Sequence, residues 1–115
     1  MTYKTHNDDN EIVALGRYQE SINCDYKILK KLFGIPIEGS DKTDAEWYIE
    51  FDDGVLSHIY NYKDGKNYLG SKGKPKTKIT DWHIGGLSIE SVNHINIVLE
   101  EYNKIEIRKK KIKSL

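Results

Sequence analysis

The sequence has few of the features that would give a small chain covalent crosslinks or a membrane anchor. Its only cysteine is Cys24, so no intramolecular disulfide framework can form, which fits a reducing compartment. The apolar runs are only a few residues long, so we expect no bilayer-spanning segment and no membrane partner. The first residues lack the basic-then-apolar pattern of a secretory signal. We therefore expect a cytoplasmic protein.

Net charge is also absent, but the charges are unevenly placed. The 115 residues include 18 basic and 18 acidic side chains. Residues 63–78 and 104–113 each hold six basic residues and one acidic residue, so the remainder of the chain is acidic. Such basic segments can meet phosphates or acidic protein surfaces. No aromatic residue interleaves the charges of 104–113, so nucleic acid is not an expected partner.

The length suits a single domain with one core. We predict a flexible lead-in over residues 1–11, a single α+β domain over 12–103 and a basic tail over 104–115. Three conformations remain open for the tail: it can fray, extend the preceding helix, or add an edge strand through Ile105 and Ile107.

A strand and a helix are predicted in the first part of the domain. Residues 12–22 alternate in polarity, which indicates a strand with one half-buried face. Asn23 is a suitable helix N-cap, and the apolar residues that follow recur at helical spacing. They are Tyr26, Leu29 and Phe33. Gly34 has the position of a left-handed glycine that ends the helix.

Alternating residues on both sides of Asp-Gly predict a β-hairpin at residues 52–54. A two-residue loop would place Ile49 beside His58. A three-residue loop with a glycine bulge would instead pair Trp47 with Ile59. We favour the second register, because it gathers the large apolar side chains on one face of the hairpin.

The last part of the domain is predicted to hold a mobile loop, a strand and a helix. A turn at residues 63–66 precedes the loop, which spans 69–78. The strand spans 79–84, and Ser88 caps a helix with one apolar face. The whole order is strand, helix, three strands, helix. An antiparallel sheet of about four strands with both helices on one face is the simplest compact arrangement, and it leaves the other sheet face free for function.

A candidate ligand site follows from the density of aromatic, amide and cationic side chains between residues 42 and 88. Rings stack on a base, amides read its edge, and cations neutralise phosphate. The residues that we assign to this site are Tyr60, Tyr62, Lys63, Asn67, Tyr68, Trp82, His83, Gly85 and Gly86. The two glycines before Ser88 could hold an anion. They lack the spacing of a phosphate-binding loop, so a strand-to-helix turn with positive φ is the favoured interpretation.

Catalytic and metal-binding signatures are weak. His58 and His83 have no partners at metal-ligand spacing, so no metal and no cofactor are predicted. Either histidine could serve as a general base with a neighbouring acid, but acids are frequent in this chain. Cys24 at a helix start would have a lowered pKa, yet we interpret it as a small apolar residue. We assign no catalytic residue.

Four segments carry a resemblance to a group of small phage- and virus-encoded proteins, over residues 16–102. They are Tyr26 to Pro36, Lys42 to Trp47, Ile59 to Lys63, and Trp82 to Gly86. The resemblance to this group assigns no activity to the chain. The resemblance implies a viral or mobile-element setting, the host cytosol as location, and action against host immunity.

Three functions remain as hypotheses from the sequence. The leading one is a non-enzymatic protein that sequesters a small nucleotide-like signalling molecule. Such a protein could act as a homo-oligomer. The alternatives are an inhibitor or adaptor that binds a host effector protein, and a small nucleotide hydrolase with His58 or His83 as base.

Overall fold

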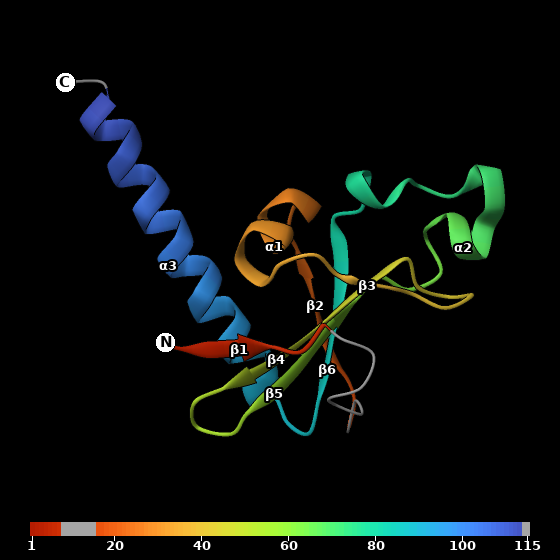
Figure 1. Cartoon of the computed structure of the whole chain (residues 1–115), viewed down its shortest axis with the longest axis horizontal. Coiled ribbons are helices and arrows are strands. Elements are labelled where there is room, and N and C mark those ends of the chain that lie inside the picture. Colours follow the sequence, from red (N-terminus) through yellow and green to blue (C-terminus); the bar gives the residue numbers. More distant parts are fainter. Residues whose placement is uncertain (8–15, 114–115) are drawn as a thin grey trace.

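The computed structural model describes residues 1–7 and 16–113 and shows an α+β fold (Figure 1). Within these residues, one antiparallel sheet has the strand order β1-β4-β5-β6-β2, and β3 also pairs with β4. The strands are β1 (Tyr3–Thr5), β2 (Arg17–Asn23), β3 (Ile37–Glu38), β4 (Ala45–Phe51), β5 (Leu56–Tyr60) and β6 (Asp81–Gly86). The helices are α1 (Tyr26–Phe33), α2 (Lys66–Leu69) and α3 (Glu90–Lys113). The predicted class is confirmed, with more strands than expected.

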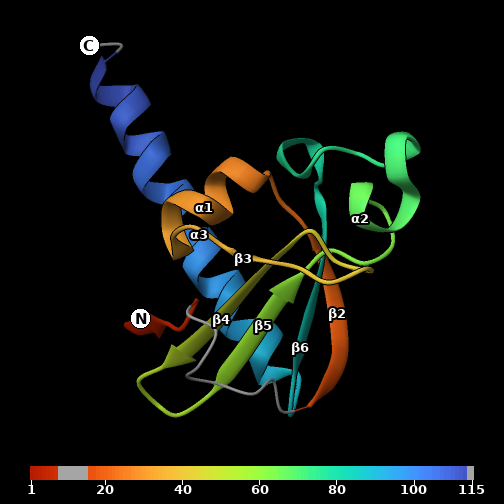
Figure 2. The same ribbon diagram turned by 45° about the vertical axis from the view of Figure 1, so that its right-hand side comes forward.

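The core lies between one face of the sheet and the helices α1 and α3. Buried and half-buried residues alternate strictly along β4, as expected for a strand with one covered face. Leu29 and Phe33 of α1, with Val92 and Ile95 of α3, belong to the same buried cluster as the inward residues of the sheet. Figure 2 shows α3 passing behind β5 and β6, which it contacts. Both long helices therefore cover the same face.

The hairpin between β4 and β5 has the favoured register. Trp47 lies opposite Ile59, and the loop is the three-residue segment 52–54. Gly54 has a φ of +89°, which a glycine adopts without steric cost. The Gly54 N–H donates to the Phe51 carbonyl, and the Phe51 N–H donates to the Val55 carbonyl, each at 2.9 Å. The prediction of a glycine-bulge loop is confirmed.

Helix α1 ends as predicted but begins two residues later. Gly34 has a φ of +86°, and its N–H donates to the Lys30 carbonyl at 2.9 Å. Asn23, predicted as the N-cap, is the last residue of β2 and lies opposite Asp81 of β6. Asp25 occupies the N-cap. Strand pairing with β6 keeps Asn23 extended, so the helix cannot begin there.

The predicted lead-in contains the short strand β1. Tyr3 packs its ring against Phe33 and Phe51, with centroid distances of 5.3 and 5.8 Å. Its hydroxyl donates to the Leu32 carbonyl at 2.9 Å. These contacts with residues far along the chain fix a segment whose own composition is polar. The rest of the predicted lead-in and the start of the predicted first strand, residues 8–15, lie outside the described residues.

The segment 63–78, for which a turn at 63–66 and a mobile loop over 69–78 are predicted, contains three short helical turns. These are α2 and the 3₁₀ turns η1 (Gly70–Lys72) and η2 (Lys76–Lys78). Fully buried Asn61 anchors the start of the segment: its side-chain oxygen accepts the N–H groups of Asp44 and Ala45 at 2.7 and 3.1 Å. The next strand was predicted at 79–84 and is observed as β6, two residues later.

The tail continues helix α3 up to Lys113, which decides among the three predicted conformations. The predicted cap is also present, because the Ser88 hydroxyl accepts the Glu90 N–H at 3.2 Å. Figure 1 shows the C-terminal half of α3 projecting beyond the sheet. In the described part of the chain, no helix combines the length and apolar character needed to cross a membrane.

Candidate ligand-binding site

A row of aromatic and imidazole rings lies on the sheet face opposite the core, which we call the open face. Tyr48 of β4 stacks on His58 of β5 at 4.3 Å with an interplanar angle of 6°. His58 also stacks on Tyr60 at 4.6 Å, and Tyr60 contacts His83 of β6 at 5.5 Å. All four rings are half-buried. We call Tyr48, His58, Tyr60 and His83 the ring row.

Two further tyrosines extend the ring row at His83. Tyr18 comes from β2 and lies 4.7 Å from His83, while Tyr62 follows β5 and lies 5.6 Å from the same ring. Both tyrosines are exposed, with relative exposures of 51% and 43%. These partly exposed rings add to the aromatic surface on which a planar ligand could stack.

The Glu46 carboxylate fixes the orientation of two members of the ring row. One oxygen lies 2.6 Å from His58 Nε2 and accepts the Tyr48 hydroxyl at 3.3 Å, and the other accepts the Thr43 hydroxyl at 2.8 Å. Burial alone would raise the pKa of Glu46, but the hydrogen bonds from His58 and Thr43 outweigh it, so the pKa is lowered. Burial and the nearby Glu46 raise the pKa of Tyr48 to about 12. Tyr48 therefore remains a neutral hydrogen-bond donor at neutral pH.

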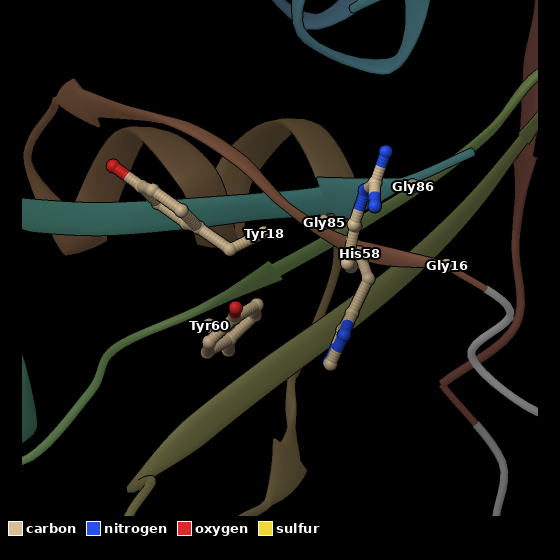
Figure 3. Close-up of a pocket in the computed structure, with 7 residues that line it drawn as sticks. Gly16, Tyr18, His58, Tyr60, Gly85 and Gly86 are labelled. Carbon is tan, nitrogen blue, oxygen red and sulfur yellow. The ribbon is translucent and has the colours of Figure 1, made fainter. Parts of the chain in front are cut away.

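A hollow opens beside the ring row where Gly85 lacks a side chain. Gly85 lies opposite His58 on β5 and opposite Tyr18 on β2. The resulting cavity has a volume of about 130 Å³, and Figure 3 shows the rings of Tyr18, His58 and Tyr60 around it. The residues that line it are Gly16, Arg17, Tyr18, His58, Tyr60, Gly85 and Gly86. The hollow thus combines three rings, one guanidinium side chain and exposed backbone.

The two consecutive glycines have different roles, and neither forms the predicted strand-to-helix turn. Both lie within β6, and neither has a positive φ. A Cβ on Gly85 would make ordinary contacts, the nearest at 3.5 Å. A Cβ on Gly86 would lie 1.9 Å from the Ser91 hydroxyl oxygen of α3. Gly86 therefore permits close packing of helix on sheet, while Gly85 leaves the hollow open.

Lys63 lies next to Tyr62, which contacts the His83 end of the ring row, and its side chain is between two tyrosines. Its ammonium is 5.1 Å from the centroid of Tyr62 and 5.3 Å from that of Tyr68. The structure therefore brings five predicted site residues into one continuous group, and a sixth, Lys63, lies at the edge of this group. These five are Tyr60, Tyr62, Tyr68, His83 and Gly85.

Two predicted site residues serve the fold instead. Trp82 is fully buried in the core, and its indole N–H donates to the Cys24 carbonyl at 2.9 Å. It follows Asp81 and precedes His83 in β6, so strand alternation directs it away from the open face. The Asn67 amide donates to the carbonyls of Ser40 and Thr43 at 3.0 and 2.8 Å and thereby ties two loops together.

Sequence reasoning missed several residues of the group. Tyr18 and Arg17 belong to β2, whose pairing with β6 joins segments that are distant in the sequence and places Tyr18 opposite Gly85. Tyr48 and His58 also lie outside the site assigned from the sequence, although His58 is one of the two histidines considered as a general base. The alternation of β4 and β5 was the available signal, because it places both on the face opposite Trp47 and Ile59.

The structure also bears on the predictions for the Cys24 thiol and for metal binding. Cys24 is buried, and burial, with the neighbouring Asp25 charge, raises the pKa of its thiol to about 11. The expectation of a lowered pKa is wrong, because Cys24 precedes the helix and faces the core. Among the described residues, no three His, Cys, Asp or Glu side chains gather in a group that could hold a metal ion.

Comparison with protein-family models, curated proteins and solved structures gives no match to this chain. The geometry of the open face is therefore the basis for proposing a function.

Proposed function

We propose that this chain is a non-enzymatic binding protein that sequesters a small nucleotide-like molecule on its open face. The observation that carries the proposal is the ring row beside the hollow at Gly85. Stacking on an aromatic side chain stabilises a bound base by about 1–3 kcal/mol. Partly exposed rings from β2, β4, β5 and β6 give several such contacts within one surface.

The size of the hollow indicates how a ligand would lie. Pockets that enclose a drug-sized ligand usually have volumes of about 300–1,000 Å³. The hollow, at about 130 Å³, is smaller, so it accommodates a single ring system and not a whole nucleotide. The remaining part of the ligand would extend along the ring row. We further propose, from the sequence resemblance to phage- and virus-encoded proteins alone, that this binding acts in counter-defence within a host cytosol.

Calorimetric titration with a panel of cyclic and linear nucleotides tests the proposal. We expect one or more nucleotides to bind, and Tyr60→Ala to weaken that binding at least tenfold through the lost stacking. Tyr102→Ala is the matched control, because the Tyr102 ring contacts Lys31 on the helical side of the molecule. Absence of heat and of any thermal shift with every nucleotide would exclude the proposed function.

A small hydrolase is the second candidate, favoured by the pair formed by His58 and Glu46. A histidine whose Nε2 lies 2.6 Å from a carboxylate has the arrangement of an oriented general base. In this case His58 would take a proton from water as the water oxygen forms a bond to the phosphorus of a phosphoester. The P–O bond to the leaving group would break, and the leaving oxygen would take a proton from solvent while protonated His58 releases its own. Mass spectrometry of the ligand after incubation distinguishes the two functions. Intact ligand supports the binder. A hydrolysis product that forms with the parent protein but not with the His58→Asn variant supports the hydrolase.

A further inference from the structure

The position of Lys63 requires an unusual backbone conformation. Its φ is +61°, and it is the only non-glycine residue with positive φ in the described ranges 1–7 and 16–113. Such a conformation is uncommon outside glycine and persists only where the surroundings impose it. The Lys63 N–H donates to the Lys42 carbonyl at 2.9 Å, which holds the backbone in place.

The neighbouring residues form a fixed support for this conformation. The buried Asn61 amide donates to the carboxylates of Asp44 and Asp64, each at 2.9 Å. Asp44 also accepts the Asn67 N–H at 3.2 Å, at the start of α2. These bonds join β4, the end of β5 and α2, and they place Tyr62 and Tyr68 around the Lys63 side chain.

Within residues 1–7 and 16–113, the Lys63 ammonium contacts aromatic rings and forms no ion pair with an acidic side chain. In the part of the chain that the structure describes, its interactions are those with the Tyr62 and Tyr68 rings. Ring faces attract a cation without neutralising its charge. An exposed, oriented ammonium of this kind can still form a charge-assisted hydrogen bond with an anionic oxygen.

Tyr62 connects this ammonium to the ring row, because its ring contacts both Lys63 and His83. We propose that Lys63, Tyr62 and Tyr68 form an anion subsite, and that the ligand is a ring system joined to a phosphate and not a neutral nucleoside. This inference depends on the proposed function and narrows its ligand class. The base would occupy the ring row, with its phosphate at Lys63.

Calorimetry with AMP against adenosine, and GMP against guanosine, tests the anion subsite, since each pair differs only by the phosphate. We expect the nucleotide to bind at least tenfold more tightly than its nucleoside. Lys63→Gln should remove most of this difference while it leaves nucleoside affinity within about twofold. Lys72→Gln is the matched control, because Lys72 is an exposed lysine of the same segment without a ring contact.

The outcomes distinguish this inference from the function on which it depends. Equal binding of nucleotide and nucleoside, or a Lys63→Gln variant that retains the full preference, would overturn the anion subsite and leave ring binding intact. Failure of nucleosides and nucleotides alike to bind would overturn both. A thermal midpoint of Lys63→Gln close to that of the parent protein shows that the change acts on binding and not on folding.

Discussion

The two faces of the sheet use the same strands for opposite purposes. Along β4, Trp47 and Ile49 are buried in the core, while Tyr48 between them stacks on His58 at the open face. Along β6, Trp82 is inward and His83 outward. One face buries apolar surface, which stabilises the fold, and the other holds polar rings fixed by Glu46. We therefore expect alternate residues in one strand to separate the stability of the fold from the proposed binding.

The largest expected effect is loss of stability when the covered face is truncated. Trp82→Ala removes a fully buried indole and should lower the free energy of unfolding by about 3–5 kcal/mol. Tyr60→Ala, on the open face, should lower it by about 1 kcal/mol. Urea denaturation of both variants measures the difference. Equal destabilisation by the two substitutions would show that the faces are not separable.

The consecutive glycines give a smaller but more closely matched contrast. Gly86→Ala places a methyl group against Ser91 and should cost about 1–3 kcal/mol, because helix and sheet must separate. Gly85→Ala should change the stability by less than about 0.5 kcal/mol. Thermal denaturation compares the two variants. If Gly85→Ala were the more destabilising of the two, the assignment of inward and outward positions in β6 would be wrong.

The smallest expected effect is the pH dependence of Glu46. Its pKa is lowered in the folded protein, so the carboxylate stabilises the fold above its unfolded pKa of about 4.3, and that stabilisation is lost as the pH falls through the folded value. Glu46→Gln should therefore lose about 1 kcal/mol at pH 7 and match the parent protein near pH 3. Urea denaturation between pH 7 and pH 3 measures this. A difference that stayed constant with pH would contradict the role of the charge.

Local patterns predicted the elements, whereas the site depends on pairing between distant segments. The hairpin register and the end of α1 followed from residues adjacent in sequence, Asp53-Gly54 and Gly34. The contact of Tyr18 with His83 required the pairing of β2 with β6, which no local pattern specifies. Local sequence likewise predicts a turn at Gly85. Its pairing with His58 of β5 and Tyr18 of β2 shows instead that it lies at the floor of a hollow.

The segment 63–78 shows a second limit of local patterns. Its glycines and lysines indicate a mobile loop, and they do not reveal that Asn61 and Asp44 fix its start by buried hydrogen bonds. Trp82 shows the converse limit. Its residue type suits a ligand site, but it alternates with Asp81 and His83 in β6 and so lies with Ile84 in the core, which residue type alone does not indicate.

Nuclear magnetic resonance of the protein during titration with the tightest-binding nucleotide tests the separation of the two faces most directly. The indole N–H groups of Trp47 and Trp82 are both buried and hydrogen-bonded to backbone carbonyls. We predict that the ring resonances of His58, Tyr60 and His83 shift with added nucleotide while both indole resonances remain in place. Shifts of the indoles without shifts of the ring row would contradict binding at the open face.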